Sequence, residues 1–151
     1  MSHFKWTENM SVGSEIVDSD HRALIGLINK VAVIADAIGE ETVADVLDGL
    51  IAYVEFHFAR EEKMMAAAGF AGVEAHGAEH AGFTDHVYQL RREFEIDETS
   101  VDAGALSDYL KNWLNHHIMI QDMAYKGDFA GNPEVEEVGR AFGEGLSERT
   151  L

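Results

Sequence analysis

Residues 57–80 read HFAREEKMMAAAGFAGVEAHGAEH, and this stretch decides the fold. On both sides of Gly69 the apolar residues recur every three or four positions, which is the spacing of one helix face. A glycine between two such patterns is typical of the position just after a helix end, so the stretch predicts two helices joined by a short turn. Short connections make successive helices antiparallel, which brings the polar residues of both helices to one end. These residues are His57, Glu61, His76 and His80.

The same helical spacing continues through most of the 151 residues, which contain a single proline. It predicts an all-α protein in which an irregular arm through about Val17 leads into an up-down-up-down four-helix bundle. We expect the four amphipathic helices at about 19–38, 42–68, 73–95 and 101–126. Their expected caps and stops are Asp18, Gly39, Gly69, Ser100 and Gly127.

Residues 128–151 form an acidic extension to a bundle made of residues 1–127. Asn132 and Pro133 predict the cap and the first residue of a short fifth helix. The apolar stripe of this helix consists of Val135, Val138, Phe142 and Leu146. The stripe either folds back on the bundle or docks on a partner protein, and folding back is the default because an exposed apolar face is costly.

The composition excludes several classes of function. Eleven basic and 28 acidic residues give a formal net charge of −17, which repels nucleic acid and anionic membrane surfaces. The absence of cysteine excludes thiolate metal sites and leaves His, Asp and Glu as the strong metal ligands. The first residues lack the pattern of a signal peptide, and no apolar run approaches the ~18 residues of a membrane span. We therefore expect a soluble cytoplasmic protein.

Five histidines and two carboxylates fall on inward helix faces at the same end of the expected bundle. They are His21, His57, Glu61, His76, His80, His117 and Asp122. The other inward positions are apolar, so we expect a single polar layer that caps an apolar core. Several imidazoles and two carboxylates buried together are costly without compensation, and a metal ion compensates them directly.

Seven ligands exceed the six places of one octahedral ion, so the set predicts two metal ions. The HxxxE and HxxxH pairs each lie about 40° apart on a helix face, which suits two ligands of one centre. His117 and Asp122 lie about 140° apart on a straight helix, so Asp122 has to reach sideways, as a bridging ligand could. With two bridging carboxylates and one shared solvent oxygen, about eleven of twelve positions are filled. Ligand type suits iron and leaves zinc, manganese and copper open.

Four short motifs occur in an order, helix phase and spacing that are jointly improbable by chance. They are DSDH at 18–21, HFAREE at 57–62, HGAEH at 76–80 and WLNHHIMIQDMAY at 113–125. On these motifs the sequence resembles the hemerythrin family, specifically its single-domain bacterial members, over about Trp6 to Tyr125.

The resemblance implies reversible dioxygen binding at a non-haem di-iron centre. It implies that the two irons are bridged by two carboxylates and an oxo or hydroxo group, and that one iron keeps an open position. The implied ligands are His76, His80 and His117 for the fully coordinated iron, His21 and His57 for the iron with the open position, and Glu61 and Asp122 as bridges.

Reversible binding also needs a dry pocket around the open position. The positions that match the family's oxygen pocket are Leu24, Phe58, Trp113, Leu114 and Ile118. For Trp113 and Leu114, plain packing in the bundle core explains the pattern equally well.

Other polar residues carry less weight. His116 is expected to face solvent, and His3 and His86 match no motif. Glu62 lies on the face next to Glu61 and is expected to be a solvated charge. Tyr125 matches a family tyrosine, and its phenol either anchors the ligand region by a hydrogen bond or caps the core.

Three classes of function remain. The first is an oxygen-binding protein for storage, transport or delivery, which the ligand set and the apolar pocket favour. The second is a di-iron oxidoreductase, such as a peroxidase or a nitric-oxide-consuming enzyme, which needs a proton donor or a wider channel at the open iron. The third is an oxygen or redox sensor, for which the extension is the one hint. A carboxylate-rich, ferritin-like oxidase is disfavoured because that class uses more Glu and fewer His.

Overall fold

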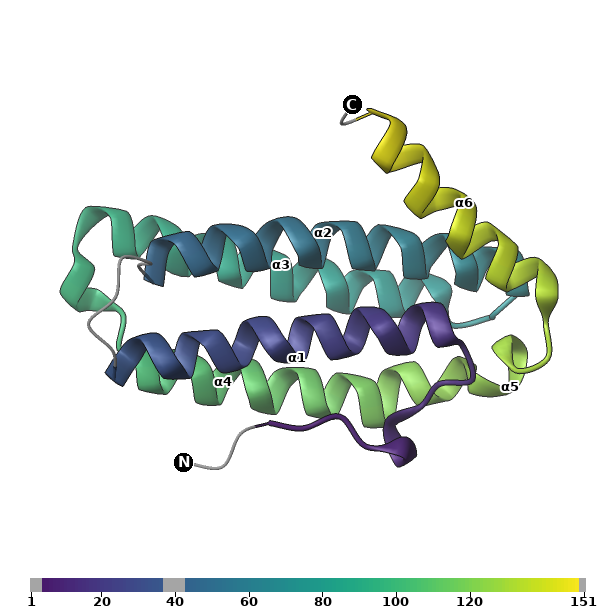
Figure 1. The fold of residues 1–151 in the computed structure, drawn as a ribbon, viewed down its shortest axis with the longest axis horizontal. Helices are drawn as coiled ribbons and strands as arrows, with labels where there is room; N and C mark the ends of the chain where they lie inside the picture. Colours follow the sequence, from purple (N-terminus) through teal and green to yellow (C-terminus); the bar gives the residue numbers. More distant parts are fainter. Residues whose placement is uncertain (1–3, 37–42, 150–151) are drawn as a thin grey trace.

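Four long antiparallel helices make up the body of the protein, as expected (Figure 1). The structure is a computed structural model and describes residues 4–36 and 43–149. No strand occurs in this part of the chain. The elements are η1 (Glu8–Met10), α1 (Glu15–Asp36), α2 (Val43–Ala68), α3 (Val73–Ile96), η2 (Glu98–Ser100), α4 (Ala103–His116), η3 (His117–Gln121), η4 (Asp122–Tyr125), α5 (Lys126–Phe129) and α6 (Pro133–Arg149).

The start of α1 differs from the prediction. The helix begins at Glu15, and Asp18 lies inside it rather than at its N-cap. The buried carboxylate of Asp18 accepts hydrogen bonds from the Ser11 hydroxyl at 2.6 Å and from the Val12 amide at 3.0 Å. The side chain that was expected to cap the helix instead ties the N-terminal arm to it.

The predicted cap of α4 is also wrong. Asp102 caps the helix, because its carboxylate accepts a hydrogen bond from the Gly104 amide at 3.1 Å. Ser100 ends η2, and its hydroxyl donates to the backbone oxygens of Glu93 and Asp97. Both residue types serve as caps, so the local sequence left two choices. The expected stop at Gly39 lies outside the described residues.

The long fourth helix changes its hydrogen-bond pattern before it ends. Regular α-helix stops at His116, and a π-helical turn, a 3₁₀ turn and the short α5 carry the chain on to Phe129. Gly127 lies within α5, so it is not the predicted stop, and the chain turns at Gly131 with φ of +68° instead. The π turn also shifts the buried face, which leaves the predicted core residue Ile120 57% exposed.

The layer of predicted metal ligands lies between two apolar clusters and does not cap a single core. The larger cluster fills the bundle and includes Phe58 of α2. The smaller one includes Met64 and Met65, one turn beyond Glu61 on the same helix. Its other members come from the arm, from the start of α1, from the chain after α4 and from α6: Val12, Val17, Tyr125, Phe129 and Val135. The polar layer is therefore closed off from water on both sides.

Helix α6 folds back on the bundle, as the default expectation held. It crosses α2 near the ligand end, with its C-terminal end directed away from the bundle (Figure 1). Val135 is fully buried, and the Phe142 ring lies 5.5 Å from the ring of Phe56 on α2. Among the described residues, no helix is both long and apolar enough to cross a membrane.

We expect Val135→Ala to lower the free energy of unfolding of the metal-free protein by about 1–3 kcal/mol, because it leaves a cavity between α6 and the smaller cluster. Urea unfolding measures this. Val33 offers a matched control, since it is 51% exposed and Val33→Ala should change the stability by less than about 0.5 kcal/mol. Equal effects of the two changes would contradict the packing of α6.

Candidate metal centre

Four segments bring all seven predicted ligands together. His21 comes from α1, and α2 carries His57 and Glu61. Helix α3 carries His76 and His80, and the chain after α4 carries His117 and Asp122. None of the seven is more than 3% exposed. The full set is His21, His57, Glu61, His76, His80, His117 and Asp122.

The Glu61 carboxylate faces two different pairs of imidazoles. Its Oε1 lies 2.8 Å from His76 Nε2 and 3.2 Å from His80 Nε2. Its Oε2 lies 3.2 Å from His57 Nε2 and 3.6 Å from His21 Nε2. One side chain thus offers an oxygen atom to each half of the cluster.

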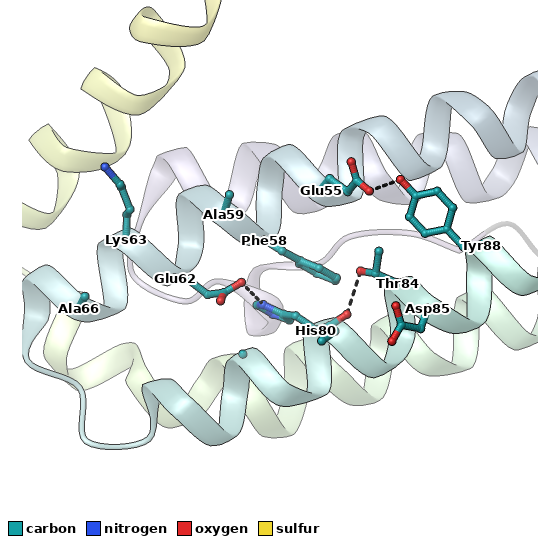
Figure 2. Close-up of a pocket in the computed structure, with 12 residues that line it drawn as sticks. Glu55, Phe58, Ala59, Glu62, Lys63, Ala66, His80, Thr84, Asp85 and Tyr88 are labelled. Atoms are coloured by element: carbon teal, nitrogen blue, oxygen red, sulfur yellow. Dashed lines mark hydrogen bonds and ion pairs between the residues drawn. The ribbon is translucent and has the colours of Figure 1, made fainter.

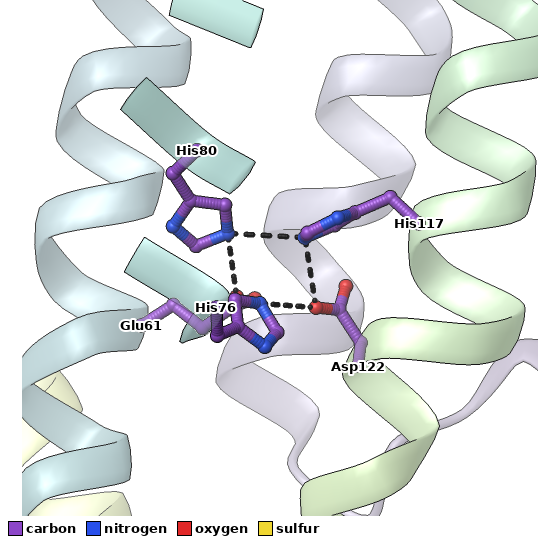
Figure 3. Close-up of side chains that lie close together, drawn as sticks. All are labelled: Glu61, His76, His80, His117 and Asp122. Atoms are coloured by element: carbon purple, nitrogen blue, oxygen red, sulfur yellow. Dashed lines mark hydrogen bonds and ion pairs between the residues drawn. The ribbon is translucent and has the colours of Figure 1, made fainter. Parts of the chain in front are cut away.

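The Asp122 carboxylate is arranged in the same way. Its Oδ1 lies 3.0 Å from His76 Nε2 and 3.1 Å from His117 Nε2, while its Oδ2 lies 3.1 Å from His21 Nε2. Figure 3 shows the half of the cluster in which Glu61, His76, His80, His117 and Asp122 point toward one another. His21 and His57 form the other half with Glu61.

The π turn explains how Asp122 reaches the centre. The Asp122 amide donates to the backbone oxygen of His117, five residues earlier, which is the bond that defines a π turn. This wider turn moves residues five apart toward the same face, whereas a straight α-helix would separate them by about 140°. The prediction that Asp122 has to reach sideways assumed a regular α-helix.

Several buried polar atoms at the centre make no hydrogen bond of good geometry, although neighbouring ones lie 2.8 to 3.1 Å from one another. They include Glu61 Oε1, both oxygens of Asp122 and the Nε2 atoms of His21 and His76. A buried polar group without a partner costs about 1–3 kcal/mol. Because these lone pairs converge from four segments, divalent cations held by nitrogen and oxygen ligands fit the arrangement.

The electrostatics of the protein alone point the same way. Burial lowers the pKa of His21 and His76, but the carboxylates of Asp122 and Glu61 outweigh it and raise these values to about 10 and about 9. Burial disfavours the charged forms of Glu61 and Asp122 and so raises their pKa values. The surrounding imidazoles outweigh this and hold both pKa values well below their ordinary values. Without metal, the negative charges of Glu61 and Asp122 therefore keep His21 and His76 protonated, and metal binding displaces these protons.

Outer contacts orient several of the ligand histidines. His57 Nδ1 lies 2.9 Å from Asp20 Oδ2, and His80 Nδ1 lies 3.2 Å from Glu62 Oε2. An imidazole that donates from Nδ1 turns the lone pair of Nε2 inward, as a metal ligand requires. Glu62 is 42% exposed, so it is solvated as predicted, but its contact with His80 was not predicted. Sequence analysis missed Asp20, although it directly precedes a ligand in the DSDH motif.

Tyr125 fulfils both of its predicted roles, because its fully buried hydroxyl donates to Glu61 Oε2 at 3.1 Å. We expect Tyr125→Phe to destabilise the metal-free protein by about 1–3 kcal/mol, since it leaves a buried carboxylate one partner short. Thermal unfolding measures the change. Tyr88→Phe is the control, because Tyr88 bonds Glu55 at the surface and its loss should cost little. A Tyr125→Phe variant as stable as this control would contradict the anchoring role.

A small apolar cavity lies in the bundle beside the ligands. Its eight lining side chains are all aliphatic or aromatic, and its volume is about 10 Å³. Four of the five predicted pocket residues line it: Leu24, Phe58, Trp113 and Leu114. Ile118 is fully buried but does not line this space.

Aromatic rings connect the cavity to the ligands. Phe58 stacks on His80 with ring centroids 3.7 Å apart, and Trp113 stacks on His117 at 4.5 Å. Phe58 also lines an open groove of about 670 Å³ between α2 and α3 (Figure 2). The ring of Phe58 therefore stands between the apolar cavity and a charged, solvent-filled surface.

A sequence model of the hemerythrin HHE cation binding domain matches residues 12–127. The chain belongs to the hemerythrin family. A bacteriohemerythrin of Stenotrophomonas maltophilia is 31% identical over 125 residues, which are 83% of this chain and 80% of that protein. A bacteriohemerythrin of Clostridium acetobutylicum is 27% identical over 127 residues, or 81% and 98% of the two chains.

The fold comparison agrees with this hemerythrin assignment. A crystal structure of wild-type hemerythrin superimposes with a TM-score of 0.79 and 27% identity, covering 86% of this chain and all of the other. Two further histidines, His86 and His116, lie outside the cluster. His116 is exposed as predicted, and His86 Nδ1 lies 3.3 Å from the Tyr109 hydroxyl. His3 lies outside the described residues.

Proposed function

We propose that the protein binds dioxygen reversibly at a non-haem di-iron centre and serves oxygen storage, transport or delivery. The observation that carries this proposal is the arrangement of the two carboxylates. Each presents one oxygen atom to each half of the histidine cluster, at 2.8 to 3.6 Å from the imidazole nitrogens. Two adjacent metal ions with shared carboxylates would take up these lone pairs.

The two halves of the cluster differ in the number of imidazoles. In our assignment His76, His80 and His117 hold one iron, and His21 and His57 hold the other. Glu61 and Asp122 would be shared by both irons, together with an oxo or hydroxo group. The half with two imidazoles would leave a position for an exogenous ligand, and the iron pair would supply the two electrons that reversible dioxygen binding uses.

The apolar cavity suits a small apolar ligand and excludes water. Leu24, one turn beyond His21 on α1, lines the cavity together with Phe58 and Trp113, which stack on His80 and His117, so the space borders both halves of the cluster. A cavity of this size holds at most one small molecule, and without polar partners a bound water would be costly. The protein therefore contributes a dry space, in which charge separation and proton entry are unfavourable.

The lining also favours an oxygen binder over a di-iron oxidoreductase. None of the eight side chains carries a carboxyl, imidazole or hydroxyl group that could deliver a proton. The open groove is lined by charged residues, but it reaches His80 and not the half of the cluster with two imidazoles.

Absorption spectroscopy of the anaerobically reduced protein, with its iron content measured, tests the proposal. We expect two irons per chain, a nearly colourless reduced form, and a visible charge-transfer band that appears in air and disappears when oxygen is removed. Irreversible oxidation would instead support an oxidoreductase or a sensor. A chain that takes up no iron would overturn the metal assignment.

A further inference from the structure

Asp20 is a buried carboxylate in contact with a ligand histidine. It is 3% exposed, and its Oδ2 lies 2.9 Å from His57 Nδ1. Two further donors hold it in place. The Tyr53 hydroxyl donates to Asp20 Oδ1 at 3.1 Å, and Arg60 Nη1 lies 3.2 Å and 3.4 Å from the two oxygens. Three side chains of α2, those of Tyr53, His57 and Arg60, therefore fix the carboxylate.

Two other histidines of the cluster also face carboxylates from their outer nitrogens, and His21 Nδ1 has no hydrogen-bond partner. His80 faces Glu62 at 3.2 Å and His117 faces Glu79 at 3.6 Å, but these carboxylates are 42% and 46% exposed. Water screens both of them. Asp20 acts from a dry environment, where a charge-assisted hydrogen bond is stronger, so His57 carries the most strongly oriented outer contact.

Arg60 connects Asp20 to the C-terminal helix. Its side chain is 14% exposed, and the guanidinium carbon lies 4.5 Å above the ring of Phe56. Phe142 of α6 packs against the same ring. A Cβ atom built on Gly143 of α6 would collide with the guanidinium, so Arg60 occupies a space that exists because position 143 is glycine.

We propose that Arg60 is a positioning residue for the Asp20–His57 pair and that α6 fixes Arg60, which makes the C-terminal helix part of the metal centre's support. The inference rests on the proposed metal pair. Coupling between two sites is reciprocal, so metal binding must strengthen the docking of α6 by the same factor by which α6 strengthens metal binding.

The first test is Asp20→Asn, which keeps the shape of the side chain and removes its charge. Competition with a chelator should show a 10- to 100-fold lower affinity for one of two iron(II) ions, as is typical when an outer partner of a ligand is lost. The midpoint potential of the iron pair should rise, because a negative charge beside His57 stabilises the oxidised state. A purely structural role would not shift this potential in a folded, fully loaded variant.

The second test separates α6 from the ligands themselves. Gly143→Ala should displace Arg60 and lower the same affinity by about 2- to 30-fold, although alanine favours the helix. Gly49→Ala is the matched control, since Gly49 lies on α2 with open space where a Cβ would be added, and this variant should bind metal like the original protein. Hydrogen exchange of the α6 amides should slow when iron(II) is added, and slow less in Gly143→Ala.

The outcomes distinguish this inference from the proposed function. If the unmodified protein does not hold two metal ions, the proposed function fails. If it holds two, and Asp20→Asn keeps both the affinity and the potential, the positioning role is overturned. If Gly143→Ala matches Gly49→Ala and metal leaves exchange in α6 unchanged, the coupling to α6 is overturned.

Discussion

Glu61→Ala is expected to bind fewer than two irons per chain while the protein remains mainly helical. The change removes two oxygen atoms at once, and each of them faces a different half of the cluster. Loss of a direct ligand that is shared by two ions weakens the binding of both. Loss of an outer partner of a ligand typically lowers metal affinity by about 10- to 100-fold, so we expect the affinity for the second iron to fall by at least about 100-fold. Iron analysis after anaerobic reconstitution and far-ultraviolet circular dichroism measure the two quantities.

Glu55→Ala is the matched control for this experiment. Glu55 lies on the same helix and carries the same charge, but it is exposed and bonds the Tyr88 hydroxyl at the surface. This variant should retain two irons. Asp122→Ala should behave like Glu61→Ala, because Asp122 also serves both halves. Two irons per chain in both Glu61→Ala and Asp122→Ala would rule out the bridging assignment.

Leu114→Ser is expected to speed autoxidation, which converts the oxygenated protein to an oxidised form that no longer binds dioxygen. Leu114 is buried and lines the apolar cavity, so a hydroxyl and a smaller side chain would admit water there. If the more polar environment lowers the free-energy barrier to autoxidation by about 1.4 kcal/mol, autoxidation becomes about tenfold faster. The decay of the visible band in air-saturated buffer gives the rate.

Leu110→Ser controls for the general cost of a buried hydroxyl. Leu110 is equally buried on the same helix, but it does not line the cavity. Ile118→Ala should have a smaller effect than Leu114→Ser, because Ile118 also lies outside the lining. An autoxidation rate that is unchanged in Leu114→Ser, or raised equally in Leu110→Ser, would contradict the role of a dry cavity.

The bundle was predictable because its signals are local and repeated. The apolar spacing around His57 and His76 fixed two helices and their inward faces, and the glycine at position 69 fixed the turn, where φ is +71°. The helix ends were less predictable. Asp18 and Ser100 have the chemistry of caps, but Asp18 bonds the arm and Asp102 caps α4, since several side chains competed for each role.

The ligand set was predictable from helix phase, but the way it closes was not. A straight helix would hold Asp122 away from His117, and only the π turn brings the two carboxylates into equivalent positions. The same turn exposes Ile120, which the regular pattern had placed inside. A π turn depends on packing around it and has no sequence pattern as clear as a helix stripe.

The sequence by itself determined which residues are buried together, because helix periodicity and antiparallel connections carry that information. The tertiary structure alone decided what surrounds them. The second apolar cluster beneath the ligands, the contact of Asp20 with His57, and the seat of Arg60 beneath α6 join residues 37 or more positions apart. Such contacts depend on how helices cross and which rotamers fit between them, and no local pattern encodes either.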